Sequence, residues 1–168
     1  MSLLPLPPRT RPIGKSGITA SSLAWGMWRF AGQSEADATR LVHAVLETGI
    51  TLFDTADIYG FDGSGGFGDA EALFGKVMAE DRSIRDRIVL ATKGGIMPPL
   101  PYDQSAAYLS AAIDASLTRL GVDRVELYQI HRPDILTHPE EVARTLADAV
   151  TAGKIASIGV SNMTMVQI

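Results

Sequence analysis

Four short apolar runs in this chain each lead into a polar residue, and this pattern constrains the possible fold more than any other feature. The runs cover residues 50–53, 88–92, 127–130 and 158–161, and the residues that follow are Asp54, Lys93, His131 and Asn162. Short runs of this kind, separated by helical patterns, are typical of buried parallel strands. Parallel strands share one end, so an acid, a base, an imidazole and an amide would meet at one edge of the sheet. In a (β/α)8 barrel, active sites form at that edge.

The composition excludes several classes of protein. The 168 residues are 46% hydrophobic and 20% charged, which is ordinary for one globular domain. A net charge of −4 argues against a nucleic-acid partner, and no apolar stretch approaches the roughly 18 residues of a membrane span. Without cysteine, disulfides and thiolate chemistry are excluded, and we expect no metal site. The start of the chain is unlike a signal peptide, so we expect one cytoplasmic domain over residues 1–168, with 1–10 as a flexible tail.

Helix and strand signals alternate along the chain. Ser34 is the expected N-cap of the first helix, Gly49 and Gly121 mark helix ends, and Thr137 opens a capping box with Glu140. In chain order we predict a hairpin at 12–20, a strand at 23–26, a helix at 34–49, a strand at 50–53, a loop at 60–68, a helix at 69–78, a strand at 88–92, a helix from 103–105 to 121, a strand at 125–130, a helix at 137–153, a strand at 155–160 and a helix start at 164–168.

This alternation predicts a parallel sheet that is either doubly wound or part of a barrel. A complete (β/α)8 TIM barrel takes about 250 residues, so the chain would hold roughly the first five strands of one, after an N-terminal β-hairpin. An open parallel sheet leaves unpaired edges and a half-covered core. We therefore expect that the 168-residue chain alone is not a stable active monomer, and that self-association or a barrel-completing segment would supply the missing contacts.

Lys93 is expected to be partly buried, because it ends an apolar strand. A buried lysine either pairs with an acid or loses its proton, and Asp54 on the adjacent strand is the natural partner. Tyr59 follows Asp54 by five residues on the next loop. A free tyrosine holds its proton tightly at neutral pH, and a nearby cation eases its release, so Lys93 would make Tyr59 a general acid. The alternative is an ion pair that only ties two strands together, beside an ordinary loop tyrosine.

The other polar residues also have functional and structural interpretations. His131 would orient a carbonyl oxygen or share the donated proton, whereas we expect His43, on a helix, and His138, in a capping segment, to be structural. Ser161 and Asn162 offer a hydroxyl and an amide that would hydrogen-bond a cofactor amide. Helix N-capping is the alternative for these two residues.

Residues 63–68 read G-x-G-x-x-G and precede a helix, as in a dinucleotide-binding fingerprint. The context differs, because the fingerprint directly follows a strand and an acidic residue stands about twenty positions later. Here the preceding strand ends at Asp54, nine residues earlier, and the next strand ends in Lys93. We therefore interpret this stretch as a flexible loop beside the site.

Several longer motifs resemble the N-terminal half of an aldo-keto reductase. They cover residues 49–60, 91–93, 116–123, 129–133 and 153–162, in the order that the family has them. The first reads GITLFDTADIYG and the last GKIASIGVSN. The resemblance implies a (β/α)8 barrel that reduces aldehydes or ketones, as small-molecule substrates, with a nicotinamide cofactor. That cofactor is usually NADPH, and NADH is the alternative.

The resemblance also implies roles for individual residues. Carried over by motif, the catalytic residues are Asp54, Tyr59, Lys93 and His131. Tyr59 would protonate the alkoxide that forms when hydride reaches the carbonyl carbon. Lys93, held by Asp54, would assist that proton transfer, and His131 would place the substrate oxygen.

The cofactor contacts implied by the resemblance come from three strand ends. Gly26 and Met27 would let the backbone approach the cofactor, and Asp54 would lie against it. Ser161 and Asn162 would hold the nicotinamide carboxamide.

Two other functions remain open at this stage. A Schiff-base aldolase also places a lysine at a barrel strand end, and Lys93 would be that lysine. A non-catalytic role is the other possibility, either as a nucleotide-sensing subunit or as a fragment that a partner completes.

Overall fold

The structure is a computed structural model that describes residues 9–167. Within these residues an antiparallel hairpin precedes a five-stranded parallel sheet and four α-helices. The elements are β1 Thr10–Pro12, β2 Thr19–Ser21, β3 Ala24–Gly26, α1 Glu35–Glu47, β4 Leu52–Asp54, α2 Asp69–Glu80, the 3-10 helix η1 Arg82–Arg87, β5 Val89–Gly94, α3 Ala106–Leu120, β6 Leu127–Ile130, α4 Pro139–Thr151 and β7 Ile158–Val160.

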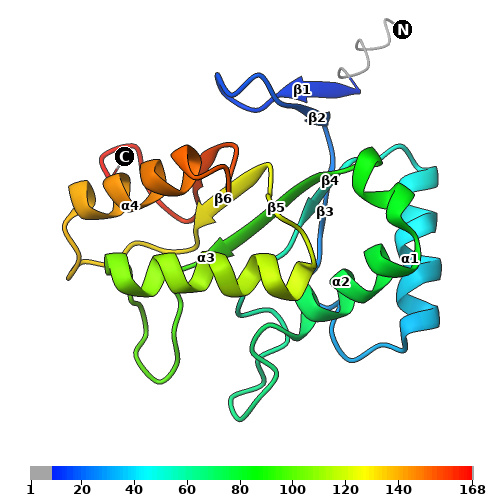
Figure 1. Cartoon of the computed structure of the whole chain (residues 1–168), viewed down its shortest axis with the longest axis horizontal. Helices are drawn as coiled ribbons and strands as arrows, with labels where there is room; N and C mark the ends of the chain where they lie inside the picture. The colour runs from blue at the N-terminus through cyan, green and yellow to red at the C-terminus, as the bar shows by residue number, and fades with distance from the viewer. Residues whose placement is uncertain (1–8, 168) are drawn as a thin grey trace, which may run out of the picture.

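The order of the strands decides between the two predicted parallel folds. The sheet runs β3-β4-β5-β6-β7, so each strand pairs with its neighbour in the chain, always in parallel. A doubly wound sheet reverses its strand order at a switch point, whereas a barrel adds strands in sequence. The helices also follow one another around the sheet, α1 against α2, α2 against α3 and α3 against α4 (Figure 1). The chain therefore forms the first five strands of a (β/α)8 barrel, as predicted.

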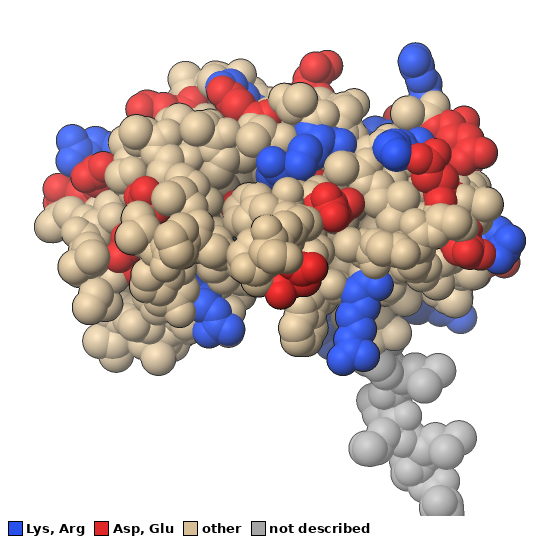
Figure 2. Space-filling view, turned by 90° about the horizontal axis from the view of Figure 1, so that it is seen from below, with Lys and Arg blue, Asp and Glu red and all other residues tan. Residues whose placement is uncertain are grey.

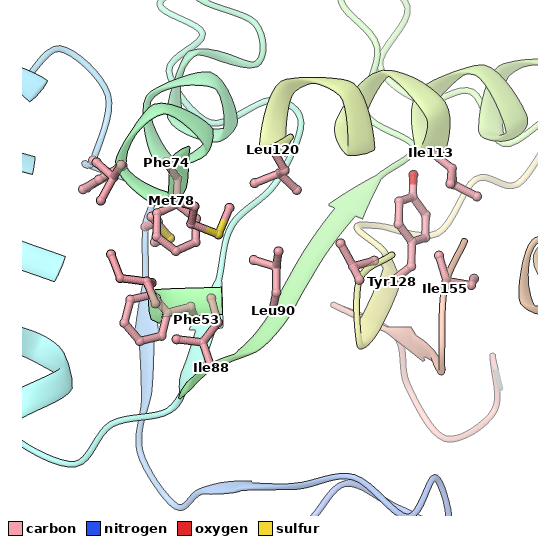
Figure 3. Packing of buried hydrophobic residues seen from close by; sticks show 14 of the residues in the cluster. Phe53, Phe74, Met78, Ile88, Leu90, Ile113, Leu120, Tyr128 and Ile155 are labelled. Carbon is pink, nitrogen blue, oxygen red and sulfur yellow. The ribbon is translucent and has the colours of Figure 1, made fainter. Parts of the chain in front are cut away.

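The hydrophobic core lies between the sheet and its helices (Figure 3). Side chains alternate between the two faces of a strand, and Phe53, Leu90 and Tyr128 point toward α2 and α3. Phe53 stacks on Phe74 of α2, with ring centroids 5.6 Å apart. Each fully buried side chain of this size stabilises the fold by about 1.5–3 kcal/mol. The opposite face of the strands is left to carry polar side chains at their carboxyl ends.

Local signals explain most element boundaries. Ser34 caps α1 by accepting from the Asp37 N–H, and Ser105 caps α3 by accepting from the Tyr108 N–H, as the sequence predicts. η1 was not predicted, since a short 3-10 helix has no helical periodicity to detect.

Two boundary predictions were wrong. The N-cap of α4 is His138 rather than Thr137, because Pro139 occupies the first helical turn and holds the preceding residue extended. Thr137 instead donates to Asp134. Residues 164–167 form a turn, closed by the Gln167 N–H and the Thr164 carbonyl at 2.9 Å, in place of a helix start. Residue 168 lies outside the described residues.

The hairpin stands at one end of the sheet (Figure 1). It is anchored to the start of β4 by a reciprocal pair of hydrogen bonds, from Ser21 N–H to Thr51 Oγ1 at 2.9 Å and from Thr51 N–H to Ser21 Oγ at 2.8 Å. Residues 1–8 of the predicted tail lie outside the described residues, and Thr10 already pairs with Ser21 in β1. The hairpin thus covers the end of the sheet opposite the polar residues.

The surface of the described residues carries mixed charges (Figure 2) and one apolar groove beside β7. On the face in Figure 2, acidic and basic side chains are mixed. Beside β7, an apolar groove of about 420 Å³ lies against α4, and Ile158 and Val160 are 42% and 38% exposed there. The sheet is therefore open at its β7 edge, as expected of an incomplete barrel.

None of the helices in residues 9–167 has the length and apolar character needed to cross a membrane.

Candidate active site

Lys93 lies at the centre of a compact polar cluster at the carboxyl end of the sheet. Its ammonium donates to Asp54 Oδ2 at 2.8 Å, to the Thr55 carbonyl at 2.8 Å and to the Tyr59 hydroxyl at 3.1 Å. Lys93 is only 5% exposed, so these contacts replace water around the charge. Gln129 donates from Nε2 to the other Asp54 oxygen at 3.0 Å. We call Asp54, Tyr59, Lys93 and Gln129 the Lys93 cluster.

The parallel ladder explains why these residues meet. In the register of the sheet Asp54 faces Ala91, two residues before Lys93, and Lys93 faces Gln129. The ladder continues past β4, since the Thr55 N–H donates to Ala91 and the Asp57 N–H donates to Lys93. The chain then turns, which brings the tyrosine ring back over Lys93, with the ammonium 4.7 Å from the ring centroid.

Gln129 is a site residue that the sequence interpretation missed. It lies inside an apolar run and two positions before His131, so it points to the same face of β6. That alternation is the signal that would have identified it. By holding Asp54 from the side, Gln129 completes the set of groups around the Lys93 charge.

His131 lies beside the Lys93 cluster, as predicted. Its ring centroid is 5.7 Å from that of Tyr59, edge to face, and its backbone N–H donates to the Gly94 carbonyl at 2.9 Å. Burial and, secondly, the positive charge of Lys93 lower the pKa of His131 to about 4. His131 is therefore neutral at physiological pH, where an imidazole can donate or accept a hydrogen bond but is not an acid. Its buried Nδ1 has no hydrogen-bond partner among the described residues.

Ser161 and Asn162 lie at the end of β7, next to His131. Asn162 donates from Nδ2 to the His131 carbonyl at 3.0 Å and to Ser161 Oγ at 2.9 Å, so its amide hydrogens are in use and Oδ1 remains as an acceptor. Asn162 has a φ of 59°, a left-handed conformation that asparagine tolerates better than most residues. No helix follows within residues 163–167, so the two residues do not act there as helix caps.

Gly26 and Met27 lie at the neighbouring edge strand, in register with the end of β4. Gly26 pairs with Asp54, and a Cβ built on it would meet no atom within 4 Å, so space above its backbone is open. The Met27 side chain is 1% exposed and packs in the core, while its N–H donates to the Asp54 carbonyl at 2.9 Å. At this edge the open backbone is therefore that of Gly26, whereas Met27 is buried and its N–H is already bonded.

The glycine-rich loop over residues 60–68 folds on itself. Asp62 Oδ1 accepts from the Ser64 N–H, the Ser64 hydroxyl and the Gly65 N–H, and these donors lower the pKa of Asp62 to about 2. Gly66 lies so close to the Gly60 carbonyl that a side chain would overlap it. The glycines thus serve the turn of the loop, in line with our rejection of a dinucleotide fingerprint there.

The two histidines that were predicted to be structural are engaged elsewhere. His43 Nε2 lies 3.5 Å from Asp81 Oδ2, and His138 caps α4.

The Lys93 cluster and His131 together combine a cation, a phenol in hydrogen-bond contact with it and a neutral imidazole beside the phenol. Such an arrangement can donate a proton to an oxygen atom that binds between Tyr59 and His131.

Comparison with known proteins agrees with this geometry. A model of the Aldo/keto reductase family matches residues 22–168. A Novosphingobium aromaticivorans protein named 6-dehydroglucose reductase is 65% identical over an alignment of 170 positions, which covers 100% of this chain and 56% of that relative. The aldo-keto reductase YhdN of Bacillus subtilis is 36% identical over 163 residues, covering 92% of this chain and 47% of the relative.

Comparison of the fold with solved structures also indicates an aldo-keto reductase. The solved holo form of aldo-keto reductase AKR11C1 from Bacillus halodurans matches with a TM-score of 0.79 and 32% identity, over 92% of this chain and 50% of that one. The chain thus spans about half the length of the relatives it matches. The predicted resemblance is confirmed, and the chain belongs to the aldo/keto reductase family.

Proposed function

We propose that this chain provides the catalytic residues of an NADPH-dependent reductase that converts an aldehyde or ketone into an alcohol, with Tyr59 as the general acid. The contact between Lys93 Nζ and the Tyr59 hydroxyl, at 3.1 Å, carries the proposal. A cation in this position stabilises the phenolate that remains once tyrosine has given up its proton. Asp54 and Gln129 keep the lysine in place for that role.

Each side chain then has one task in the reduction. A bound reduced nicotinamide supplies hydride to the carbonyl carbon. Tyr59 donates its proton to the carbonyl oxygen as the C=O bond becomes C–OH, and Lys93 stabilises the negative charge left on the phenol oxygen. His131, being neutral, hydrogen-bonds the substrate oxygen and does not compete as an acid.

The residues at the strand ends fit a nicotinamide. A carboxamide needs both a donor and an acceptor from the protein, and the free Oδ1 of Asn162 can accept its N–H. Ser161 adds a hydroxyl at the same strand end. The open backbone at Gly26 leaves room for a flat ring on the other side of Asp54. We propose NADPH rather than NADH as the cofactor, and the cytoplasm as the location of the protein.

The substrate that we propose is a sugar carbonyl. The relative with 65% identity over the whole chain is named 6-dehydroglucose reductase, and we propose the same substrate here. A hexose presents hydroxyl groups around its carbonyl, whereas butanal presents none. Reduction of 6-dehydroglucose with a kcat/KM well above that for butanal would support this class of substrate, and the reverse order would refute it.

An aldolase is disfavoured by the environment of Lys93. Its nitrogen is engaged by three acceptors at 2.8–3.1 Å, whereas a Schiff base forms only from an amine that is free to attack a carbonyl carbon. Borohydride should therefore trap no substrate on Lys93. A covalent adduct located there by mass spectrometry would reverse this conclusion.

The test of the proposed function is NADPH oxidation, followed at 340 nm, by two proteins. One is the 168-residue chain, and the other is the same chain joined to the C-terminal remainder of the Novosphingobium relative. We expect turnover from the joined protein, because the chain alone has an open sheet edge. Turnover by neither protein would refute the function, and turnover by the chain alone as a monomer would refute the need for further strands.

The Tyr59→Phe variant tests the acid. Removing a general acid lowers kcat by about 10² to 10⁴, and NADPH binding, measured by fluorescence, should be kept. Tyr102→Phe is the matched control, since Tyr102 is 37% exposed and outside the Lys93 cluster. Equal kcat values for the two variants would refute the assignment of Tyr59.

A further inference from the structure

A second group of buried polar side chains lies on the helix side of the sheet, behind the Lys93 cluster. It comprises Asp57, Glu71, Thr92, Tyr108, Arg119 and Tyr128, which we call the Arg119 cluster. The chemistry described above does not use it. Three segments contribute to both clusters: residues 54–59, β5 with Thr92 and Lys93, and β6 with Tyr128 and Gln129.

The charges of the Arg119 cluster do not balance. Glu71 is fully buried and takes two contacts of the guanidinium, with Arg119 Nε at 2.7 Å and Nη2 at 2.6 Å, and the Thr92 hydroxyl donates to it as well. Asp57 is also fully buried, and its carboxyl group meets only neutral donors, the Ile58 N–H and the Tyr108 hydroxyl at 3.5 Å. Its Oδ1 has no side-chain partner among the described residues. Two buried carboxyl groups thus lie near one cation, and Glu71 is the one that pairs with it.

A buried carboxyl group without a cation keeps its proton. Burial and, secondly, the negative charge of Glu71 raise the pKa of Asp57 to about 8, although the Arg119 charge and the hydrogen bonds from Ile58 and Tyr108 oppose them in part. The titratable groups that face Asp57 are Glu71 from α2, Tyr108 and Arg119 from α3, and Tyr128 from β6. Neither tyrosine supplies a positive charge.

Packing leaves little space for a compensating ion. Gly94 lies between Asp57 and Tyr128, and a Cβ at Gly94 would overlap the Tyr128 hydroxyl and lie 3.1 Å from Asp57 Oδ2. The Tyr128 hydroxyl is itself buried without a partner among the described residues. The neutral acid suits such a site better than the carboxylate, because no cation is paired with it and its own O–H can be donated to a neighbouring hydroxyl oxygen.

Asp57 also lies at the point where the segment must be held. Its N–H donates to the Lys93 carbonyl at 3.0 Å, and the Tyr59 N–H donates to the Ala56 carbonyl at 3.1 Å to close the turn. A single residue, Ile58, separates the acid behind the sheet from the phenol in front of it. A shift of the chain at Asp57 would therefore move Tyr59 as well.

We propose that Asp57 is a positioning residue that works as a neutral carboxylic acid, holding residues 54–59 so that the Tyr59 hydroxyl meets Lys93, and that loss of its proton loosens this placement. The catalytic part of this inference rests on the proposed function. The protonation of Asp57 does not, and it can be tested separately.

The first experiment measures protonation without any turnover. In the joined protein, the Asp57 carboxyl carbon, assigned by its loss in Asp57→Asn, should titrate by NMR near pH 8. Between pH 4 and 8 the folded chain holds this proton and the unfolded chain does not, so Asp57 lowers stability as pH rises across that window. Asp57→Asn should therefore raise the Tm by several degrees at pH 8 and leave it unchanged at pH 4.

The control for this experiment is Asp123→Asn, at an exposed position, which should leave the pH dependence of the Tm unchanged. A carboxyl carbon of Asp57 that is already ionised at pH 6 would overturn the inference. So would an Asp57→Asn variant whose Tm falls with pH in parallel with that of the parent chain.

The second experiment uses the joined protein and compares Asp57→Asn with Asp57→Ala. Asp57→Ala should lower kcat about tenfold or more relative to the parent protein, with NADPH affinity kept. Asp57→Asn, which puts a neutral group of the same shape there, should keep most of the parent kcat and extend activity to higher pH. Equal kcat losses and equal pH profiles in the two variants would overturn the positioning role. If the parent protein has no turnover, the proposed function fails, and the first experiment still decides whether Asp57 is neutral.

Discussion

The Lys93 cluster and the Arg119 cluster lie on opposite faces of the same strands, and their charges are arranged differently. Lys93 faces one carboxylate, Asp54, whose side chain is 26% exposed. Arg119 faces two carboxyl groups, and both Glu71 and Asp57 are completely buried. The first cluster therefore pairs one cation with one partly exposed carboxylate, whereas the second places two fully buried carboxyl groups beside one cation, Arg119.

This difference suggests that the two clusters have different tasks. A cluster that exchanges protons with a substrate needs access and a cation that stabilises the group left behind. A cluster that only holds the chain needs burial and fixed hydrogen bonds, and removal of either member of a buried ion pair is costly. We therefore expect substitutions at Lys93 to affect catalysis most, and substitutions at Arg119 to affect folding most.

Lys93→Met should have the largest effect. Without the cation, the Tyr59 phenolate is not stabilised, and we expect kcat of the joined protein to fall by about 10³ or more. Lys76→Met is the matched control, because Lys76 forms only an exposed pair with Glu35. Steady-state kinetics with 6-dehydroglucose provide the measurement, and a loss below tenfold would remove Lys93 from the chemistry.

Arg119→Met should act on stability instead. Glu71 would remain buried without its partner, which costs about 3–5 kcal/mol in the free energy of unfolding, measured by urea denaturation. The double variant Arg119→Met with Glu71→Gln should recover part of that loss, since no uncompensated charge remains. A single variant as stable as the parent chain would show that the Arg119 cluster does not hold the fold together.

His131 and Asp57 should give opposite pH dependences of stability. The pKa of His131 is lowered to about 4 by burial, so between pH 4 and 6.5 the unfolded chain binds more protons than the folded one. Stability due to His131 therefore rises with pH across this window, whereas that due to Asp57 falls. Melting curves of His131→Gln from pH 4 to 7 should lack the rise, and a rise as steep as in the parent chain would contradict this.

Asn162→Ala should have the smallest effect. It removes one side-chain acceptor at a partly exposed strand end, and one hydrogen bond contributes about 0.5–1.5 kcal/mol. The NADPH dissociation constant of the joined protein should rise about threefold to tenfold, with kcat little changed. An unchanged dissociation constant would remove Asn162 from the cofactor site.

The sequence pattern was sufficient for the strand ends because that information is local. Apolar runs predict where Asp54, Lys93 and His131 leave their strands, and Ser34 and Ser105 sit where helices begin. Tyr59 lies on a loop and carries no periodic signal, so its role was inferred from its place five residues after Asp54, and the resemblance to aldo-keto reductases implied the same role.

The amino-acid sequence by itself therefore determined the alternation of elements, the family and the residues at the strand ends. The periodic pattern left a doubly wound sheet and a barrel open, the resemblance implied the barrel, and the strand order in the structure confirmed it, because strand order depends on pairing between distant segments. Only the tertiary structure decided that Gln129 holds Asp54 and that Asp57, Glu71 and Arg119 meet behind the sheet. Charge balance in a buried cluster is a property of neighbours in space, and no pattern along the chain reports it.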